Sequence, residues 1–329
     1  MKTDFQYLIG VDGGGTGTRV VLAAVAPTLS STASTAEFCH GSVILGRGSA
    51  GPSGLMHGAE PAWQAILSAV EMAFATAKVV MPALSHIAIG CGLAGVNNKQ
   101  WAADFTEKTP GFGCLTIETD AGTTLLGAHQ GKAGAIIALG TGSVGEVMLA
   151  DGSRREVGGW GFPSSDEASG AWLGMRAINH VQQVLDGRSQ SDDFALALIA
   201  FCRAELVDEK IVAEQSPHAA PRDVIFTWLA RANQTRFAQL APLVIAYAGR
   251  IAKATEIMQA AGIEVAKMAG ALDPSGQLPL ALCGGLAEPM LTYLPPELAA
   301  RVGKPQADSA IGALILVRNQ CLPSLTEAL

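Results

Sequence analysis

A run of glycines and threonines close to the N-terminus has the composition of a phosphate-binding turn: Asp12-Gly13-Gly14-Gly15-Thr16-Gly17-Thr18. Apolar residues 7–11 precede it and residues 19–25 resume a β-branched pattern, which predicts two strands joined as a hairpin. Consecutive glycines let a backbone approach an anion with its N–H groups free, and the Thr16 and Thr18 hydroxyls add donors. An ordinary Asp-Gly hairpin turn is the alternative, but it needs only one or two glycines.

Asp12, at the start of this turn, constrains the chemistry further. A carboxylate repels a phosphate unless a cation lies between them, and Mg²⁺ is the cation that commonly accompanies nucleotide phosphates. We therefore expect the turn to bind the phosphates of ATP, and Asp12 to bind Mg²⁺ directly or through water.

A second glycine turn, Gly140-Thr141-Gly142-Ser143, lies between apolar residues 135–139 and 144–149. It repeats the strand-turn-strand pattern of the first. Two such hairpins, each near the start of its own α/β half, suggest duplicated lobes that face one another across a cleft. A third glycine pair, Gly284-Gly285, follows residues 280–282 and would let an adenine or ribose lie against backbone, although a plain strand-to-helix turn predicts the same residues.

Asp120 follows the predicted strand at residues 115–119, at the carboxyl end where ligands of α/β proteins bind. A carboxylate there can orient an attacking hydroxyl and accept its proton during phosphoryl transfer. Asp is also favoured at a helix N-cap, and a helix is predicted at residues 123–130. The residues alone leave both roles open.

Residues 158–167, Gly-Gly-Trp-Gly-Phe-Pro-Ser-Ser-Asp-Glu, form a predicted loop that leads directly into a helix. Ser164 and Glu167 fit a capping box, which leaves Asp166 unexplained. A carboxylate beside flexible glycines suits bidentate hydrogen bonding to neighbouring sugar hydroxyls, and Trp160 either packs on a sugar ring or fills the core.

Other nucleotide motifs fit less well. Gly131-Lys132 lacks the upstream glycine and the following hydroxyl of a P-loop. Gly140-x-Gly142-x-x-Gly145 leads into a strand, whereas pyrophosphate binding needs a helix N-terminus. Gly90-x-Gly92-x-x-Gly95 is harder to dismiss, because a helix follows it and Glu118 lies at the distance of a ribose contact. It supports a second hypothesis, an NAD-dependent oxidoreductase.

The rest of the chain alternates helices with strands, which is typical of an α/β fold. Helical spacing occurs at residues 62–79 and 100–108, and buried strands are predicted at residues 86–89 and 115–119. Residues 168–257 are mainly helical. The chain ends in a predicted helix, residues 309–318, that we expect to pack back on the first lobe.

Composition limits the class of protein. A length of 329 residues favours two domains, and a net charge of -7 disfavours nucleic acid or an anionic membrane as the main partner. The six cysteines show no zinc spacing, so we expect reduced thiols. Residues 79–98 lack charge but contain a proline and several glycines, and the N-terminus does not resemble a signal peptide. We expect a soluble, cytoplasmic protein.

The order and spacing of several segments resemble the sugar kinase, Hsp70 and actin superfamily: residues 12–19, Gly140 to Ser143, Gly284-Gly285 and Gly312. Within it, the chain resembles the N-acetylglucosamine and glucosamine kinases of the BadF/BadG/BcrA/BcrD ATPase family at Glu118-Thr119-Asp120, at the loop of Gly159, Trp160, Asp166 and Glu167, and at Lys304-Pro305-Gln306-x-Asp308.

The resemblance implies two ribonuclease-H-like, actin-like ATPase lobes around a central cleft: residues 1–120, completed by a C-terminal helix at 308–329, and residues 121–307. It implies transfer of the ATP γ-phosphate to the 6-hydroxyl of N-acetyl-D-glucosamine or D-glucosamine, with Mg²⁺. Asp120 would be the base and would also contact the sugar, and Asp166 would bind sugar hydroxyls beside Gly159, Trp160 and Glu167. Closure of the lobes would exclude water.

The chain departs from the family at two positions that would touch the sugar. An Asn expected in the first-lobe sugar loop is replaced around Gly51, and Val144 stands where the animal enzymes have Asn. The family also contains iron-sulfur ATPases that activate dehydratases, a third hypothesis that requires paired cluster cysteines. We expect a small-molecule amino sugar as the partner, no nucleic acid or membrane, and a homodimer.

Overall fold

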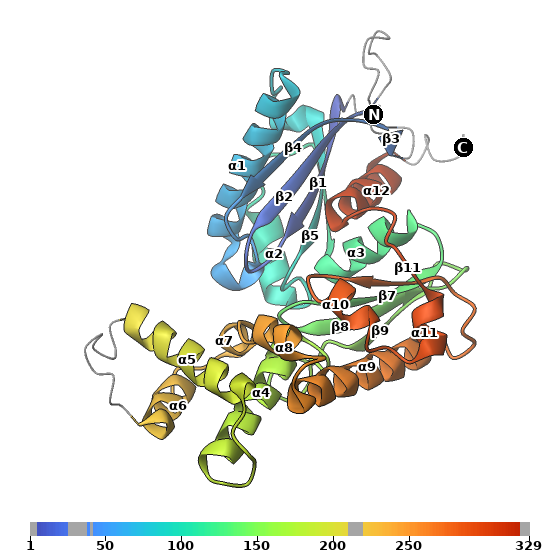
Figure 1. Ribbon diagram of the computed structural model, residues 1–329. Coiled ribbons are helices and arrows are strands. Elements are labelled where there is room, and N and C mark those ends of the chain that lie inside the picture. The colour runs from blue at the N-terminus through green and yellow to red at the C-terminus, as the bar shows by residue number, and fades with distance from the viewer. Residues whose placement is uncertain (1–4, 26–37, 40–41, 210–219, 323–329) are drawn as a thin grey trace. The chain divides into compact units, whose positions relative to one another are not determined.

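The computed structural model describes residues 5–25, 38–39, 42–209 and 220–322 (Figure 1). The chain divides into two compact units. Unit 1 comprises Met1–Ile136, Met148–Ser153 and Lys304–Leu329, and unit 2 comprises Ile137–Val147 and Arg154–Gly303. The helix that follows Asp120 clusters with unit 1, and so does the segment that contains Lys304 and Pro305. Part of the expected C-terminal helix, residues 323–329, lies outside the described residues.

Unit 1 contains a six-stranded mixed sheet with the order β3-β4-β2-β1-β5-β6. Its strands are β1 (Tyr7–Gly13), β2 (Thr18–Ala24), β3 (Phe38–Cys39), β4 (Ser42–Ala50), β5 (Ile87–Leu93) and β6 (Cys114–Thr119). Strands β1 and β2 form the predicted antiparallel hairpin, and β5 runs parallel to both β1 and β6. The carboxyl ends of β1, β5 and β6 therefore meet at one edge of the sheet.

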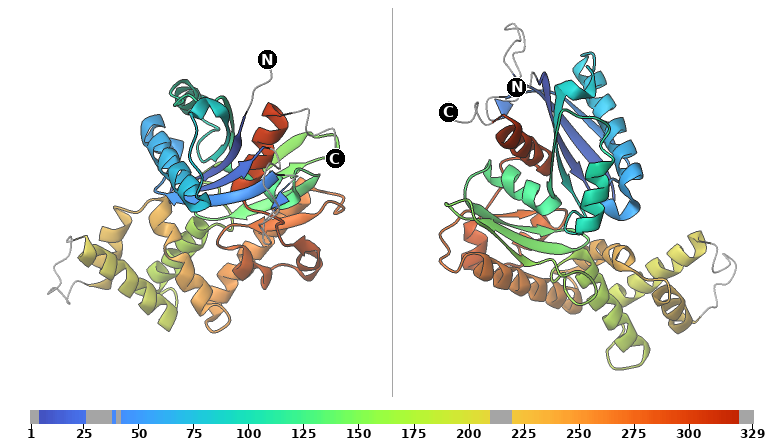
Figure 2. Two further views of the ribbon diagram at one scale, coloured as in Figure 1. Left: turned by 90° about the horizontal axis from the view of Figure 1, so that it is seen from above. Right: turned by 180° about the vertical axis from the view of Figure 1, so that it is seen from behind.

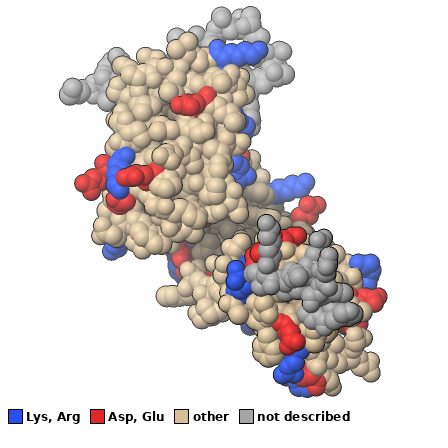
Figure 3. Space-filling model, turned by 90° about the vertical axis from the view of Figure 1, so that its left-hand side faces the viewer, with Lys and Arg blue, Asp and Glu red and all other residues tan. Residues whose placement is uncertain are grey.

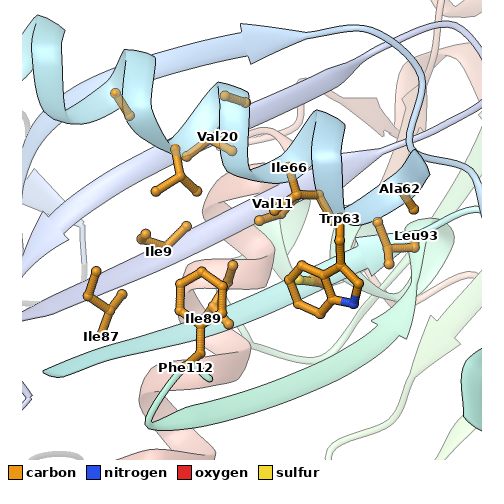
Figure 4. Close-up of a cluster of buried hydrophobic side chains, with 14 of the residues drawn as sticks. Ile9, Val11, Val20, Ala62, Trp63, Ile66, Ile87, Ile89, Leu93 and Phe112 are labelled. Atoms are coloured by element: carbon orange, nitrogen blue, oxygen red, sulfur yellow. The ribbon is translucent and has the colours of Figure 1, made fainter. Parts of the chain in front are cut away.

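Helix α1 (Ala59–Ala77) covers one face of this sheet. Trp63 and Ile66 project from the helix onto Ile9, Val11 and Val20 of the strands, and all five are buried (Figure 4). Strand β4 was not predicted because its glycines interrupt the strand pattern. Packing against α1 explains both, since a Cβ at Gly48 would lie 1.9 Å from the carbonyl oxygen of Ala69 and one at Gly46 would lie 2.3 Å from that of Ala73.

Helix α12 (Ser309–Cys321) covers the opposite face, where its apolar residues cluster with Leu8 and Val21 of the sheet (Figure 1). It also crosses α3 (Asp120–His129) closely. A Cβ at Gly312 would lie 1.8 Å from the carbonyl oxygen of Thr123, and one at Gly127 would lie 2.1 Å from that of Asp308. The crossing fixes the helix that begins at Asp120. Helix α2 (Lys99–Glu107) completes this unit with the short helices η1 (Leu55–His57) and η2 (Leu84–His86).

Unit 2 is organised around a five-stranded sheet with the order β11-β10-β7-β8-β9. The strands are β7 (Gly134–Leu139), which starts within unit 1, β8 (Ser143–Met148), β9 (Arg154–Gly158), β10 (Leu280–Cys283) and β11 (Val302–Gly303). The long helix α9 (Ala252–Leu272) runs along β9 (Figure 2). Its other helices are α4 (Gly170–Leu185), α5 (Asp193–Asp208), α6 (Pro221–Leu229), α7 (Gln234–Ala238), α8 (Ala241–Tyr247), α10 (Ala287–Leu291) and α11 (Pro296–Arg301).

The structure gives the Gly90 motif a packing role in place of the dinucleotide turn considered above. Gly90 and Gly92 lie inside β5, not after it. A Cβ at Gly90 would lie 2.2 Å from the carbonyl oxygen of Ala313, and one at Gly92 would lie 1.9 Å from the hydroxyl of Thr123. These glycines let α12 and α3 pack against the strand, and nothing in their placement favours NAD.

The capping-box prediction was wrong, and the N-cap role left open for Asp120 is excluded. The capping box at Ser164 and Glu167 does not form, because α4 begins at Gly170 and Ser169 caps it by accepting from the N–H of Trp172 at 3.1 Å. Helix α3 is capped by Thr119, which accepts from the N–H of Gly122 at 2.9 Å, so Asp120 is not the N-cap.

The prediction that all six cysteines are reduced was also wrong. A disulfide joins Cys114 in β6 to Cys321 at the end of α12, with Cα atoms 6.5 Å apart and a sequence separation of 207. Spacing could not reveal this pair, because only the packing of α12 beside β6 brings the two residues together. Cys91, Cys202 and Cys283 are buried thiols, and burial raises the pKa of Cys202 and Cys283 to about 12.

The surface agrees with the low content of charged residues, 16%. On the face drawn in Figure 3, acidic and basic side chains are sparse and interspersed, without a basic patch. Among the residues that the structure describes, no helix combines the length and the apolar character needed to cross a membrane.

Candidate active site

The first glycine turn connects β1 to β2 and is closed by the N–H of Gly14, which donates to the carbonyl of Gly17 at 3.0 Å. A Cβ at Gly13 would lie 2.1 Å from the Ser53 hydroxyl oxygen, so packing alone requires this glycine. A Cβ at Gly14 or Gly15 would meet nothing within 4 Å. The fold therefore does not require these two glycines, and the open space beside them is available to a ligand.

Thr18 and Thr16 differ in what their hydroxyls can do. Thr18 is 1% exposed; its hydroxyl donates to the carbonyl of Gly51 at 2.6 Å and lies 2.7 Å from the Ser53 hydroxyl oxygen. Thr16 is exposed. Thr18 thus ties the turn to the loop at Gly51 and Ser53, and only Thr16 presents its side chain outward. Ser53 gave no signal in the sequence, because its partners are distant along the chain.

Asp12 is held by Arg19, whose Nε donates to the Asp12 Oδ2 at 2.9 Å and whose Nη2 also contacts that oxygen. The ion pair leaves Oδ1 of the half-buried carboxylate for other ligands. No group of three or more His, Cys, Asp or Glu within the described residues could hold a metal by itself. Asp12 thus suits a cation that phosphates and water also bind, as Mg²⁺ commonly is, and not an all-protein site.

Asp120 is the first residue of α3, at the edge where β6 ends. Its Oδ1 accepts from the N–H of Ala121 at 3.0 Å. Although its side chain reaches solvent, the surrounding protein raises the pKa of Asp120 by desolvation, and the negative charge of Asp12 adds to this rise. The structure therefore brings Asp120 close enough to Asp12 for the two charges to interact within unit 1.

The second glycine turn connects β7 to β8 in unit 2. The N–H of Gly170 donates to the Gly140 carbonyl at 2.8 Å and that of Ala171 to the Thr141 carbonyl at 3.2 Å, so the start of α4 holds the turn. Gly140 and Thr141 are exposed. The Ser143 hydroxyl donates to the carbonyl of Glu167 at 2.7 Å, which joins the turn to the loop before α4.

Asp166 is buried, at 4% exposure, and adopts the left-handed backbone conformation with φ at 66°. Its Oδ1 accepts from the Ser143 N–H at 3.4 Å, and its Oδ2 accepts from Nε2 of Gln234 at 2.7 Å. Desolvation raises the pKa of Asp166, and the neighbouring charge of Glu167 raises it further. Gln234 lies 68 residues away on α7, and no sequence pattern pointed to it.

Trp160 is 87% exposed, which excludes the core role considered for it. The loop around it bends at Gly159, with φ at 70°, and a Cβ on that glycine would lie 3.1 Å from Cγ2 of Val144. Gly159, Asp166 and Glu167 therefore contact Ser143 or Val144 beside the second glycine turn, and Trp160 directly follows Gly159 in this loop. An indole exposed to this extent is available to stack on a ligand.

The third glycine pair adjoins the second turn. Gly284 has φ at 88°, and a Cβ there would lie 2.4 Å from the carbonyl oxygen of Leu139, which also accepts from the Leu286 N–H at 3.1 Å. Gly285 faces open space. Packing thus accounts for Gly284, whereas Gly285 leaves room for a flat ligand.

Known proteins resemble the chain over nearly its whole length. It is 29% identical over 312 residues to the glucosamine kinase GspK of Vibrio cholerae, covering 94% of this chain and 95% of that protein. A structure from Chromobacterium violaceum, solved as a candidate N-acetylglucosamine kinase, is 44% identical, with a TM-score of 0.81 and 95% and 99% of the two chains covered.

A Porphyromonas gingivalis structure, also solved as a candidate N-acetylglucosamine kinase, shares the fold at 16% identity, with a TM-score of 0.58 over 95% and 99% of the two chains. These likenesses and the two sheets confirm the two-lobed α/β class of fold. The model of the BadF/BadG/BcrA/BcrD ATPase family matches residues 9–317, from β1 into α12. The chain therefore belongs to the BadF/BadG/BcrA/BcrD ATPase family.

Proposed function

We propose that the chain is an amino-sugar kinase that transfers the γ-phosphate of ATP to the 6-hydroxyl of D-glucosamine or N-acetyl-D-glucosamine. Its membership of an ATPase family and its likeness to a glucosamine kinase along 94% of its length support phosphoryl transfer from ATP to an alcohol. The observation that carries the proposal is the placement of Asp120, with a raised pKa, in the same unit as the open glycine turn at Asp12.

The glycine turns would hold the nucleotide. In unit 1, the open backbone of Gly14 and Gly15 and the outward hydroxyl of Thr16 would bind phosphate oxygens. In unit 2, Gly140 and Thr141 would do the same, and Gly285 would lie against the adenosine. Asp12 would hold Mg²⁺ together with the phosphates, and the ion would supply positive charge that offsets the negative charge of the transferring group.

Asp120 would bind the acceptor hydroxyl and take its proton as the oxygen attacks. A general base works best when its pKa approaches the working pH, and the surroundings of Asp120 raise its pKa in that direction. The carboxylate accepts without donating when it is ionised, so it also fixes the orientation of the hydroxyl.

Asp166 would accept from other sugar hydroxyls, since each of its oxygens retains a lone pair beyond the bonds to Ser143 and Gln234. Trp160 would stack on the apolar face of the ring, and Gly159 and Glu167 would complete this side of the acceptor site. The non-polar side chain of Val144, next to Gly159, would lie against the substituent at the amino position of the sugar.

The dehydratase-activating ATPases of the same family are not favoured. Their iron-sulfur cluster needs paired, accessible thiolates. Among the cysteines whose side chains are described, Cys114 and Cys321 are joined to each other and Cys91, Cys202 and Cys283 are buried thiols. No contact of these residues suggests a cluster.

A coupled ADP-release assay tests the proposal, with glucosamine, N-acetylglucosamine, glucose, N-acetylmannosamine and no sugar as separate reactions. We expect turnover that depends on an amino sugar, with the highest kcat/KM for glucosamine or N-acetylglucosamine. Equal ADP release with and without sugar would contradict kinase activity, and a preference for glucose would contradict the amino-sugar assignment.

Two further expectations belong to the same proposal. We propose that the protein acts in the cytoplasm, where ATP is available, and that it is a homodimer. Sedimentation equilibrium measures the second directly: a mass near twice 33.8 kDa is expected, and a monomer at every concentration tested would contradict it.

A further inference from the structure

Gln234 makes a contact that links the acceptor loop to the second glycine turn. Its Nε2 donates to Oδ2 of Asp166 at 2.7 Å, and the other carboxylate oxygen of Asp166 accepts from the backbone of Ser143 at 3.4 Å. The carboxylate is thus held from two sides, by a helix of unit 2 and by the turn between β7 and β8. All these residues belong to unit 2.

Gly142 lies beside this contact and leaves it room. A Cβ at Gly142 would lie 3.0 Å from Oδ2 of Asp166 and 3.0 Å from Nε2 of Gln234. The turn, the carboxylate and the amide therefore pack directly against one another, and any side chain at Gly142 would press on the hydrogen bond itself.

The helix that carries Gln234 is firmly placed. Helix α7 starts at Gln234, and its N-cap Asn233 accepts from the N–H of Arg236 at 3.0 Å. Phe237 packs edge-on against Trp228, with ring centroids 5.3 Å apart. A Cβ at Gly174 of α4 would lie 1.9 Å from the Phe237 carbonyl oxygen, so α7 and α4 are in close contact. The amide of Gln234 is therefore presented from a fixed backbone.

The backbone of Asp166 lacks such support from regular structure. Asp166 and Ala168 both adopt positive φ, at 66° and 65°, in a loop between β9 and α4. A buried carboxylate in this conformation can rotate unless donors hold it, and sugar hydroxyls are recognised through fixed lone-pair directions. The hydrogen bond from Gln234 is short and to a charged acceptor, the class that contributes most.

We propose that Gln234 is a positioning residue of the acceptor site, which fixes the Asp166 carboxylate against the second glycine turn so that it can bind sugar hydroxyls. The inference rests on the proposed function, because the role of Asp166 toward a sugar belongs to that proposal. Gln234 itself contacts no reacting atom in this scheme.

Three variants test it, each assayed with the preferred amino sugar. Gln234→Ala removes the donor, and we expect the KM for the sugar to rise about tenfold or more while the KM for ATP changes less than about twofold. Gln239→Ala is the matched control: it replaces a glutamine at the C-cap of the same helix that makes no contact with Asp166, and we expect wild-type constants.

Gln234→Glu separates positioning from packing through pH. At neutral pH two ionised carboxylates would repel one another, and the sugar KM should rise at least as far as in Gln234→Ala. As the pH falls, a proton shared between the introduced carboxyl group and Asp166 would restore the hydrogen bond, so the deficit relative to wild type should shrink. The deficit of Gln234→Ala, which has no carboxyl group at this position, should not shrink.

The other charged groups nearby remain the same in both variants. They are Glu167 on the loop, Arg176 on α4, which lies over the ring of Trp172, and Arg236 on α7, which pairs with Glu209. Any effect of these groups on the sugar KM is common to both variants. A difference between the variants therefore reports on position 234.

A readout independent of activity distinguishes the failure of this inference from the failure of the proposed function. Hydrogen exchange of the Ser143 amide, which donates to Asp166, should be faster in Gln234→Ala than in wild type and unchanged in Gln239→Ala. Unchanged exchange together with an unchanged sugar KM would overturn the role of Gln234. If exchange is faster but the protein phosphorylates no sugar, Gln234 does hold Asp166 in place, but the kinase assignment is wrong. The proposed role of Gln234 in sugar binding then fails with that assignment.

Discussion

Asp120 and Asp166, the two carboxylates proposed to bind the acceptor sugar, are held by different kinds of contact. Asp120 stands in the first turn of α3, where backbone N–H groups and the helix dipole favour its ionised form. Desolvation and the charge of Asp12 disfavour the ionised form. Their effect exceeds that of the hydrogen bond from Ala121, so the pKa of Asp120 is raised. Asp166 is buried and held through hydrogen bonds from Ser143 and Gln234. The first suits proton transfer, and the second suits recognition.

Asp120→Asn keeps the shape of the side chain but removes its basicity. We expect kcat to fall by a factor on the order of 10²–10⁴ while ATP binding, measured by calorimetry, is retained. Asp104→Asn, at a half-exposed acid of α2 in the same unit that pairs with Lys108, should leave kcat unchanged. Wild-type kcat in Asp120→Asn would remove Asp120 from the chemistry.

The pH profile gives a second test of Asp120. Only the ionised carboxylate can accept a proton, so kcat/KM should rise with pH as Asp120 loses its own proton. Because its pKa is raised, the midpoint of this acid limb should lie above the range of an ordinary aspartate. An acid limb that persisted unchanged in Asp120→Asn would assign the titration to another group.

At the scale of single elements, the sequence predicted the glycine turns well because their signal is local. Both hairpins formed where the runs of apolar residues and glycines placed them. What each glycine does was not predictable, since Gly13 packs against Ser53, which is distant in sequence, while Gly14 and Gly15 face open space. Strand β4 was missed for the same reason: its glycines serve a helix that lies later in the chain.

Two substitutions in the first glycine turn distinguish a glycine required for packing from one available to a ligand. Gly15→Ala places a methyl group in open space, so the melting temperature should stay within about 2 °C of wild type. The KM for ATP should rise by on the order of tenfold, because the backbone can no longer approach the phosphates as closely. Gly13→Ala should instead destabilise the fold. A wild-type KM for ATP in Gly15→Ala would argue against phosphate binding at this turn.

The disulfide joins two elements of unit 1, and its contribution to the free energy of unfolding can be measured. It closes a long loop between β6 and α12, so its loss should lower the free energy of unfolding by about 2–4 kcal/mol. Denaturant unfolding of wild type without reductant, wild type with reductant and Cys321→Ser should give one stable and two equally destabilised proteins. A reductant effect that persisted in Cys321→Ser would point to another source.

For the whole molecule, the order of segments along the chain carried the prediction of two α/β lobes and of the family, and both are confirmed. Contacts between segments that are distant along the chain could not be predicted from the sequence. The pairing of Cys114 with Cys321, the crossing of α12 and α3 at Gly312, and the bond between Gln234 and Asp166 each depend on packing that no local pattern encodes. The capping box at Ser164 failed because Ser169, later in the same loop, caps the helix.

The proposed choice of acceptor depends on residues that lie far apart along the chain. Asp120 lies in unit 1, and Asp166, Trp160 and Val144 lie in unit 2. Val144 offers no polar group to an acetyl amide. The kcat/KM values for glucosamine and N-acetylglucosamine would show which of the two is the preferred acceptor.

The chemical identity of the product tests the proposed kinase activity most directly. Phosphorus NMR of a reaction that contains ATP, Mg²⁺ and the preferred amino sugar should show one phosphomonoester formed for each ADP, coupled to the protons at carbon 6 of the sugar. Release of inorganic phosphate with the sugar unchanged would contradict kinase activity.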